Sequence, residues 1–147
     1  MSPIIFLFIG FLLLVGGSIV TLATHRLRRV CSWLSFSFVL AAAGCFLYLA
    51  VLVFTGGTVA MAEPLLILPG IGASLTIAID PLSALLLLII SIISSCATLF
   101  SVQYTLRYQN ESLARYYPFL LLLFASIVGV VCARDMLFFI VFWEIMT

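Results

Sequence analysis

The chain has 147 residues, of which 66% are hydrophobic and only 7% are charged. Soluble domains carry about 25% charged residues, and a soluble chain this apolar could not cover its own surface with polar groups. The composition therefore excludes an ordinary soluble domain and predicts an integral membrane protein. The net charge of +1 also argues against nucleic acid as a partner.

The first apolar run predicts a retained transmembrane helix over residues 3–24. A spanning helix needs about 20 mainly apolar residues, and the basic stretch HRLRR at residues 25–29 follows this run instead of preceding it. A cleaved signal peptide has the opposite order. A second span is predicted over residues 31–54, directly after the basic loop.

Residues 55–79 form the least helical segment, and we predict a short β-hairpin within this extramembrane loop. Pro69-Gly70 suits a type II turn, because proline fixes the first central residue and glycine accepts the positive φ of the second. After the turn, apolar residues alternate with small or polar ones in the period of a strand. The candidate partner strand is Leu65–Leu68.

A third span is predicted over residues 81–105. Asp80 precedes Pro81 in the order of an N-cap and a first helical residue, so a structural role for Asp80 is favoured over a direct role in transport. Hydroxyl residues spaced i, i+3, i+4 and i+7 share one face of this helix: Ser91, Ser94, Ser95 and Thr98. They could line a hydrated path, but helix packing, with hydroxyls bonded to carbonyls one turn earlier, is the favoured interpretation.

A fourth span is predicted over residues 113–132, and a fifth, incomplete helix over residues 135–147. Asp135 is placed to cap the fifth helix. Ala125 and Gly129 indicate a close-packing face on the fourth. The loops after the first and third spans carry five of the six basic residues. By the positive-inside rule, both loops lie in the cytoplasm and the amino terminus lies outside.

The sequence predicts neither a metal site nor a cofactor site. The four cysteines stand singly and lack the spacing of a metal, redox or iron–sulfur motif: Cys31, Cys45, Cys96 and Cys132. The only histidine, His25, lies in the basic loop. Since no nucleophile–base pair is evident, we do not expect catalysis by this chain alone.

Glu144, in the apolar stretch FFIVFWEIMT, is the strongest candidate functional residue. It follows Asp135 by nine residues, about 13 Å of helix, which places it near the midplane of a hydrocarbon core about 30 Å thick. Burial there favours the protonated form, whereas a nearby cation favours the ionised form. Because an intramembrane ionisable residue is a functional-site hypothesis by default, we interpret Glu144 as a proton-relay carboxylate and not as a packing residue.

Two stretches, IDPLSALLLLIISI and ARYYPFLLLLFASIVGVVCARDMLFFIVFWEIMT, carry a family resemblance over residues 79–147. The sequence resembles the antiporter-like membrane subunits of respiratory complex I, Mrp-type sodium/proton antiporters and energy-converting hydrogenases. Its FWEIMT form is most similar to hydrogenase 4 component B and the formate hydrogenlyase membrane subunit. The residues that match the family pattern are Asp80, Leu82, Ser83, Asp135, Phe138, Trp143, Glu144 and Met146.

The resemblance implies an all-α polytopic membrane protein of a bacterial or archaeal inner membrane, with about five transmembrane helices in one membrane domain over residues 1–147. It also implies that Glu144 serves proton translocation, beside other membrane subunits of a redox-driven complex. In the family this glutamate pairs with a lysine on the seventh helix, and this chain contains no lysine.

The fifth helix, at about 18 to 20 Å, is too short for a core of about 30 Å. We therefore expect an amino-terminal fragment of a longer subunit, a split gene product or a truncated reading frame. The alternative is a structural or assembly subunit with no transport of its own.

Overall fold

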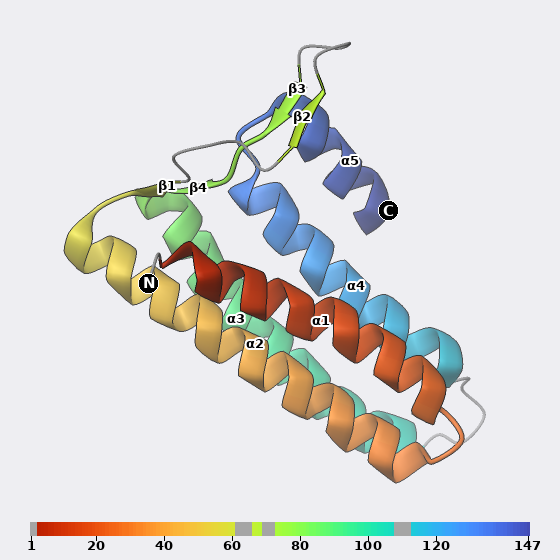
Figure 1. The fold of residues 1–147 in the computed structure, drawn as a ribbon. Helices are drawn as coiled ribbons and strands as arrows, with labels where there is room; N and C mark the ends of the chain where they lie inside the picture. The colour runs from red at the N-terminus through yellow and green to blue at the C-terminus, as the bar shows by residue number, and fades with distance from the viewer. Residues whose placement is uncertain (1–2, 61–65, 69–72, 108–112) are drawn as a thin grey trace.

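The computed structural model describes residues 3–60, 66–68, 73–107 and 113–147, and its helices follow the predicted order (Figure 1). Four helices in the described residues are long and apolar enough to cross a membrane: α1 (Ile4–Thr24), α2 (Arg28–Gly56), α3 (Pro81–Arg107) and α4 (Leu113–Cys132). A shorter apolar helix, α5 (Met136–Met146), follows. The predicted polytopic helical fold is confirmed.

Two of the helices extend beyond the predicted spans at their arginine-bearing ends. α2 begins at Arg28 instead of residue 31, and α3 continues to Arg107. Arginine is a good helix former, and its long apolar stem lets the charged group reach water from a helix end. The helices can therefore continue past the apolar stretch that marks each span.

The core of the molecule lies where α1 to α4 pack together, and close helix approach shapes it (Figure 1). A Cβ added to Gly17 of α1 would lie 2.8 Å from Phe38 of α2 and 2.7 Å from Leu121 of α4. Gly10 of α1 faces Phe46 of α2 in the same way. Small residues that let helices approach are the usual basis of packing between membrane helices.

Four short strands form the predicted hairpin region between α2 and α3 as two antiparallel pairs: β1 (Val59–Ala60), β2 (Leu66–Leu68), β3 (Ala73–Leu75) and β4 (Ala78–Ile79). In the inner pair, β2 with β3, Leu66 faces Leu75. In the outer pair, β1 with β4, Val59 faces Ile79. The hairpin is confirmed, while the predicted Pro69-Gly70 turn lies outside the described residues.

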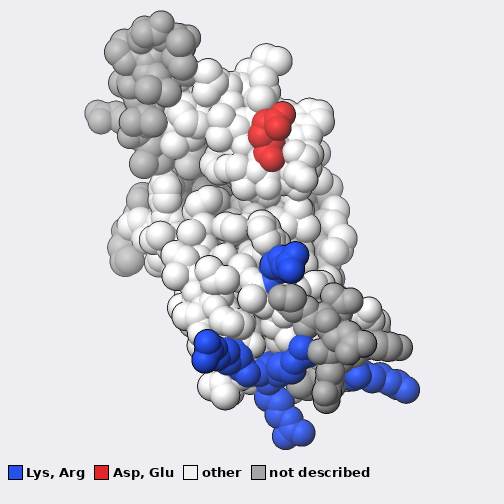
Figure 2. All heavy atoms as spheres, turned by 90° about the vertical axis from the view of Figure 1, so that its right-hand side faces the viewer, with Lys and Arg blue, Asp and Glu red and all other residues white. Residues whose placement is uncertain are grey.

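The bundle has two distinct ends. The hairpin end carries the four strands and the start of α5; the arginine end carries the α1–α2 connection, the end of α3 and the start of α4 (Figure 1). In Figure 2 the basic side chains gather toward one end of the face shown, and the acidic side chain visible there lies in the other half. The two predicted basic loops therefore belong to the same end.

α5 leaves the hairpin end and runs back beside α4 (Figure 1). Described over its whole length, it buries none of its residues fully. One close contact is the Phe142 ring against Gly129 of α4, where an added Cβ would lie 2.5 Å from the ring. Phe142 also makes an edge contact with Phe11 of α1, at 6.1 Å between ring centroids. The predicted close-packing face on α4 thus receives α5.

Gly129→Val should loosen the α4–α5 contact, because the added side chain occupies the place of the Phe142 ring. Overpacking of this kind costs about 1–3 kcal/mol, measurable as a lower midpoint of detergent-induced unfolding. Gly44→Val is the matched control, since a Cβ at Gly44 meets no atom of the described residues within 4 Å. Equal unfolding midpoints for the two variants would contradict the assigned contact.

Candidate functional site

Asp80 is the N-cap of α3, as the sequence predicts. The Ser83 backbone N–H donates to Asp80 Oδ1 at 2.6 Å. The hydrogen bonds from Ser83 hold the pKa of the Asp80 carboxyl below its usual value. A carboxylate accepting backbone N–H groups at a helix start is stabilised in its charged form, so Asp80 has a sufficient structural role.

Asp135 caps α5 and also binds the hairpin. The Leu137 N–H donates to Asp135 Oδ1 at 2.8 Å, and the Ser74 N–H donates to Oδ2 at 3.2 Å. The bond from Ser74, followed by that from Leu137, lowers the pKa of the Asp135 carboxyl. The cap was predicted from sequence. The contact with β3 was not, because it joins residues 61 positions apart.

The hydroxyl stripe on α3 is used for packing. Ser91 donates to the Leu87 carbonyl at 2.6 Å, and Thr98 donates to the Ser94 carbonyl at 2.7 Å. Ser94 and Ser95 both donate to the Ser91 carbonyl. Each hydroxyl therefore bonds within its own helix, as the favoured packing interpretation expects.

Toward the arginine end, the same face of α3 carries Ser101 and Thr105. With Ser32 of α2 and Tyr117 of α4 they form a buried hydroxyl cluster. Thr105 Oγ1 lies 2.8 Å from the Tyr117 hydroxyl and 3.2 Å from Ser32 Oγ. Tyr117 also donates to the Ser101 carbonyl at 3.3 Å. The cluster joins α2, α3 and α4. Sequence reasoning missed it, although the i, i+3/i+4 spacing of the stripe already extends to Ser101 and Thr105.

Ser101 has the one buried side-chain oxygen in the described residues that lacks a hydrogen-bond partner. Its relative exposure is 1%. An unpaired buried hydroxyl costs free energy, so this position is the weakest point of the cluster.

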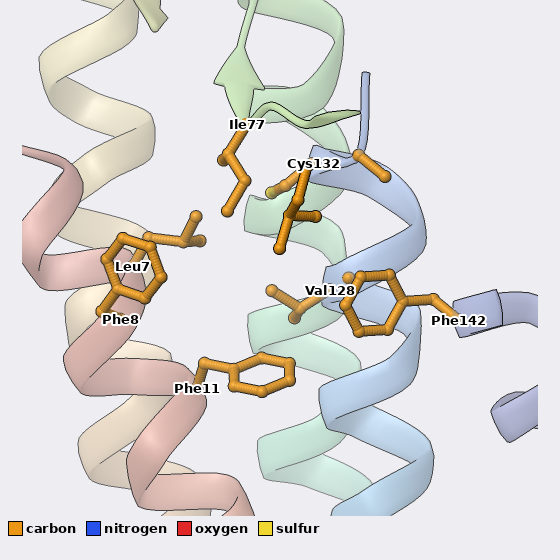
Figure 3. A pocket seen from close by; sticks show the side chains of 10 residues that line it. Leu7, Phe8, Phe11, Ile77, Val128, Cys132 and Phe142 are labelled. Atoms are coloured by element: carbon orange, nitrogen blue, oxygen red, sulfur yellow. The ribbon is translucent and has the colours of Figure 1, made fainter. Parts of the chain in front are cut away.

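An apolar pocket of about 120 Å³ lies between α1, α4, α5 and the hairpin. Figure 3 shows Leu7, Phe8 and Phe11 on one side, Phe142 on the other, and Ile77 at the top. The side chains labelled there are hydrocarbon apart from the thiol of Cys132. A pocket of this chemistry can hold hydrocarbon, but it offers nothing to orient a polar substrate.

Glu144 lies eight residues after the first residue of α5 and is exposed on that helix. Within the described part of the chain, no basic side chain forms an ion pair with it. Trp143 beside it packs edge-on against Phe139, with ring centroids 5.8 Å apart. The structure therefore brings Asp80 and Asp135 to the hairpin end as caps, and leaves Glu144 on the outer surface of the bundle.

Acidification should weaken the hairpin end of the fold. The folded-state pKa values of Asp80 and Asp135 are lowered. Their contribution to stability is thus complete when the pH is above the unfolded-state pKa of about 3.9. It is lost as the pH falls through the folded-state pKa values. The double variant Asp80→Asn, Asp135→Asn should lose less stability between pH 5 and pH 3 than the wild type in detergent unfolding. An unchanged pH dependence would contradict this assignment.

Removal of the Tyr117 hydroxyl should destabilise the fold without affecting its outer surface. Tyr117→Phe deletes the bond to Thr105 and should cost about 1 kcal/mol, as measured by detergent-induced unfolding. Tyr116→Phe serves as the control, because Tyr116 is 38% exposed. If the two variants unfold alike, the buried cluster does not contribute as described.

Residues 67–117 match the sequence model described as NADH-ubiquinone oxidoreductase (complex I), chain 5 N-terminus. One subunit of a Na(+)/H(+) antiporter from Alkalihalophilus pseudofirmus is 35% identical over 91 residues, which cover 62% of this chain and 11% of that protein. A "Putative antiporter subunit mnhA2" of Staphylococcus haemolyticus is 32% identical over 139 residues, or 90% of this chain and 17% of that protein.

The chain therefore spans less than a fifth of the length of these relatives. The matched family model includes the third span and the start of the fourth, which also carry part of the sequence resemblance. The fold is consistent with these likenesses. The described residues form four helices of membrane-spanning length and a hairpin before α3. Over these regions the chain is similar to the antiporter-like membrane subunits of complex I and of sodium/proton antiporters.

Proposed function

We propose that this chain is the amino-terminal part of a proton-translocating subunit in a multisubunit membrane complex, and that Glu144 takes up and releases the proton. The observation that carries the proposal is the placement of Glu144. It is the one ionisable residue of α5, a described helix of 11 otherwise apolar residues on the outside of the bundle. Placing a carboxyl group in the membrane costs free energy, so such a residue is a functional-site hypothesis by default.

The chemistry needed is a change in the protonation of Glu144 that depends on a neighbouring cation. In apolar surroundings the neutral, protonated form of a carboxyl group is favoured, and an approaching cation favours the ionised form. Approach of the cation then releases the proton, and its withdrawal allows a proton to bind again. The described side chains supply no ion-pair partner, so the cation would come from another membrane segment that packs against the exposed face of α5.

The proposed orientation places the arginine end in the cytoplasm and the hairpin end outside. Five arginines lie at the arginine end: one in the α1–α2 connection, two at the start of α2, one at the end of α3 and one at the start of α4. Cytoplasmic loops carry an excess of arginine and lysine. The amino terminus, which precedes α1 at the opposite end, would then lie outside a bacterial or archaeal inner membrane.

The names of the relatives bear on the type of complex. They describe subunits of sodium/proton antiporters, whereas the matched family model is named for complex I. We favour proton transfer within an antiporter assembly over the redox-driven complex that the sequence alone suggested. The resemblance to hydrogenase 4 component B stays a prediction.

A structural role is the second candidate, and two observations favour it. The hydroxyls of the α3 stripe bond to carbonyls of their own helix, and the described residues give Glu144 no ion-pair partner. A scaffold subunit would need no more than this packing.

Glu144→Gln tests the proposal in membrane vesicles that carry the chain in its native assembly. Glutamine keeps the size of the side chain but cannot exchange a proton, so proton transfer per assembled complex should fall by at least about 100-fold. Asp80→Asn is the control, because asparagine still caps a helix. Transfer at the wild-type rate in Glu144→Gln would refute the relay and leave the scaffold role.

A further inference from the structure

The junction between α4 and α5 is joined to the hairpin through the Asp135 carboxylate and the Arg134 backbone N–H. Asp135 Oδ1 accepts from Leu137 in the first turn of α5, while Oδ2 accepts from Ser74 in β3. The Arg134 N–H donates to the Thr76 carbonyl at 3.1 Å. One carboxylate therefore starts the helix and ties that start to the hairpin.

Two backbone interactions lie next to the Asp135–Ser74 bond and hold its two residues close together. Ile77 and Ala133 form an antiparallel bridge next to it, so the junction extends the edge of the hairpin. The Thr76 N–H donates to the Ser74 carbonyl at 2.9 Å, a three-residue turn of the kind found at strand ends. This turn ends β3 near the junction, where the Ser74 N–H meets Asp135.

α5 packs against α4, but its packing is shallow. None of its residues is fully buried over its described length, and its contacts include the Phe142 ring against Gly129 and Phe11. The apolar pocket of about 120 Å³ lies beside that ring (Figure 3). Because a ring next to a cavity can shift without a clash on that side, the bonds at the junction are the directional constraint on α5.

The start of α5 determines where Glu144 lies. Each residue of an α-helix advances about 1.5 Å and turns about 100°. A slip of one residue at the junction would therefore move the carboxylate and turn it toward a different neighbour. Misplacement by about 1 Å can slow a reaction by about 100-fold.

We propose that Asp135 is a positioning residue for Glu144, because its bond to Ser74 fixes the depth and rotation of α5. The inference rests on the proposed function of Glu144, since depth matters for transport only if this carboxylate transfers the proton. Asp80 offers a natural comparison: it caps α3 through Ser83 in its own helix.

The test uses Asp135→Ser in vesicles that carry the native assembly. Serine still caps a helix, but its single oxygen cannot also reach the hairpin as the second carboxylate oxygen does. Asp80→Ser is the matched control at the same end of the bundle. A nitroxide on Ile140→Cys, a site 45% exposed on α5, reports depth and mobility after the four native cysteines are replaced by alanine.

In Asp135→Ser the Ser74 amide should exchange with solvent about tenfold faster, as expected for one lost hydrogen bond, while Leu137 stays protected. The label should change depth and mobility, and proton transfer should fall at least about tenfold. Asp80→Ser should alter none of these values. If Asp135→Ser does not accumulate, Ser74→Pro removes the same N–H donor and leaves the cap of α5 intact.

Faster exchange at Ser74 with unchanged label depth and unchanged transfer would overturn the proposal. Failure of the proposed function has a different signature. In that case Glu144→Gln keeps wild-type transfer, while the exchange and depth changes in Asp135→Ser still occur.

Discussion

Close approach between helices is the constraint on which the rest of this structure depends. Lipid tails solvate apolar side chains as well as a protein core does, so membrane helices associate through packing and interhelical hydrogen bonds. Here Gly17 admits the side chains of Phe38 and Leu121, and the Thr105–Tyr117 bond joins α3 to α4. The hydroxyls of the α3 stripe bond to carbonyls of their own helix, so the bond between α3 and α4 comes from a residue further along α3.

α5 follows a different principle. It packs on the outside of the bundle against α4, with none of its residues fully buried. The hydrogen bonds at its first residues add a directional constraint to this packing. The hairpin therefore contributes more than a cover for the bundle, because the strand edge it presents to residues 133–135 is what receives the start of α5.

Features set by local signals could be predicted from the sequence. The lengths of the apolar runs predicted the four spans. An aspartate directly before an apolar helix predicted the caps Asp80 and Asp135. Contacts between distant segments could not be predicted in this way. The Asp135–Ser74 bond and the Ser32–Thr105 contact span 61 and 73 positions, and their partners are small polar residues with no distinctive pattern. The extra turn at the start of α2 was missed because hydropathy marks the lipid-buried part of a helix and not its full length.

The described carboxylates differ in the groups that surround them, and this difference distinguishes the two helix caps from the proposed proton carrier. Asp80 and Asp135 accept backbone N–H groups, which are fixed in place and keep these groups charged at neutral pH. A fixed partner of this kind makes a carboxylate a good cap and a poor proton carrier. Glu144 stands on an exposed helix face, and no basic side chain of the described bundle forms an ion pair with it. Under the proposed function, a movable cation would pair with Glu144, and the Asp135 cap would hold α5 in register with that partner.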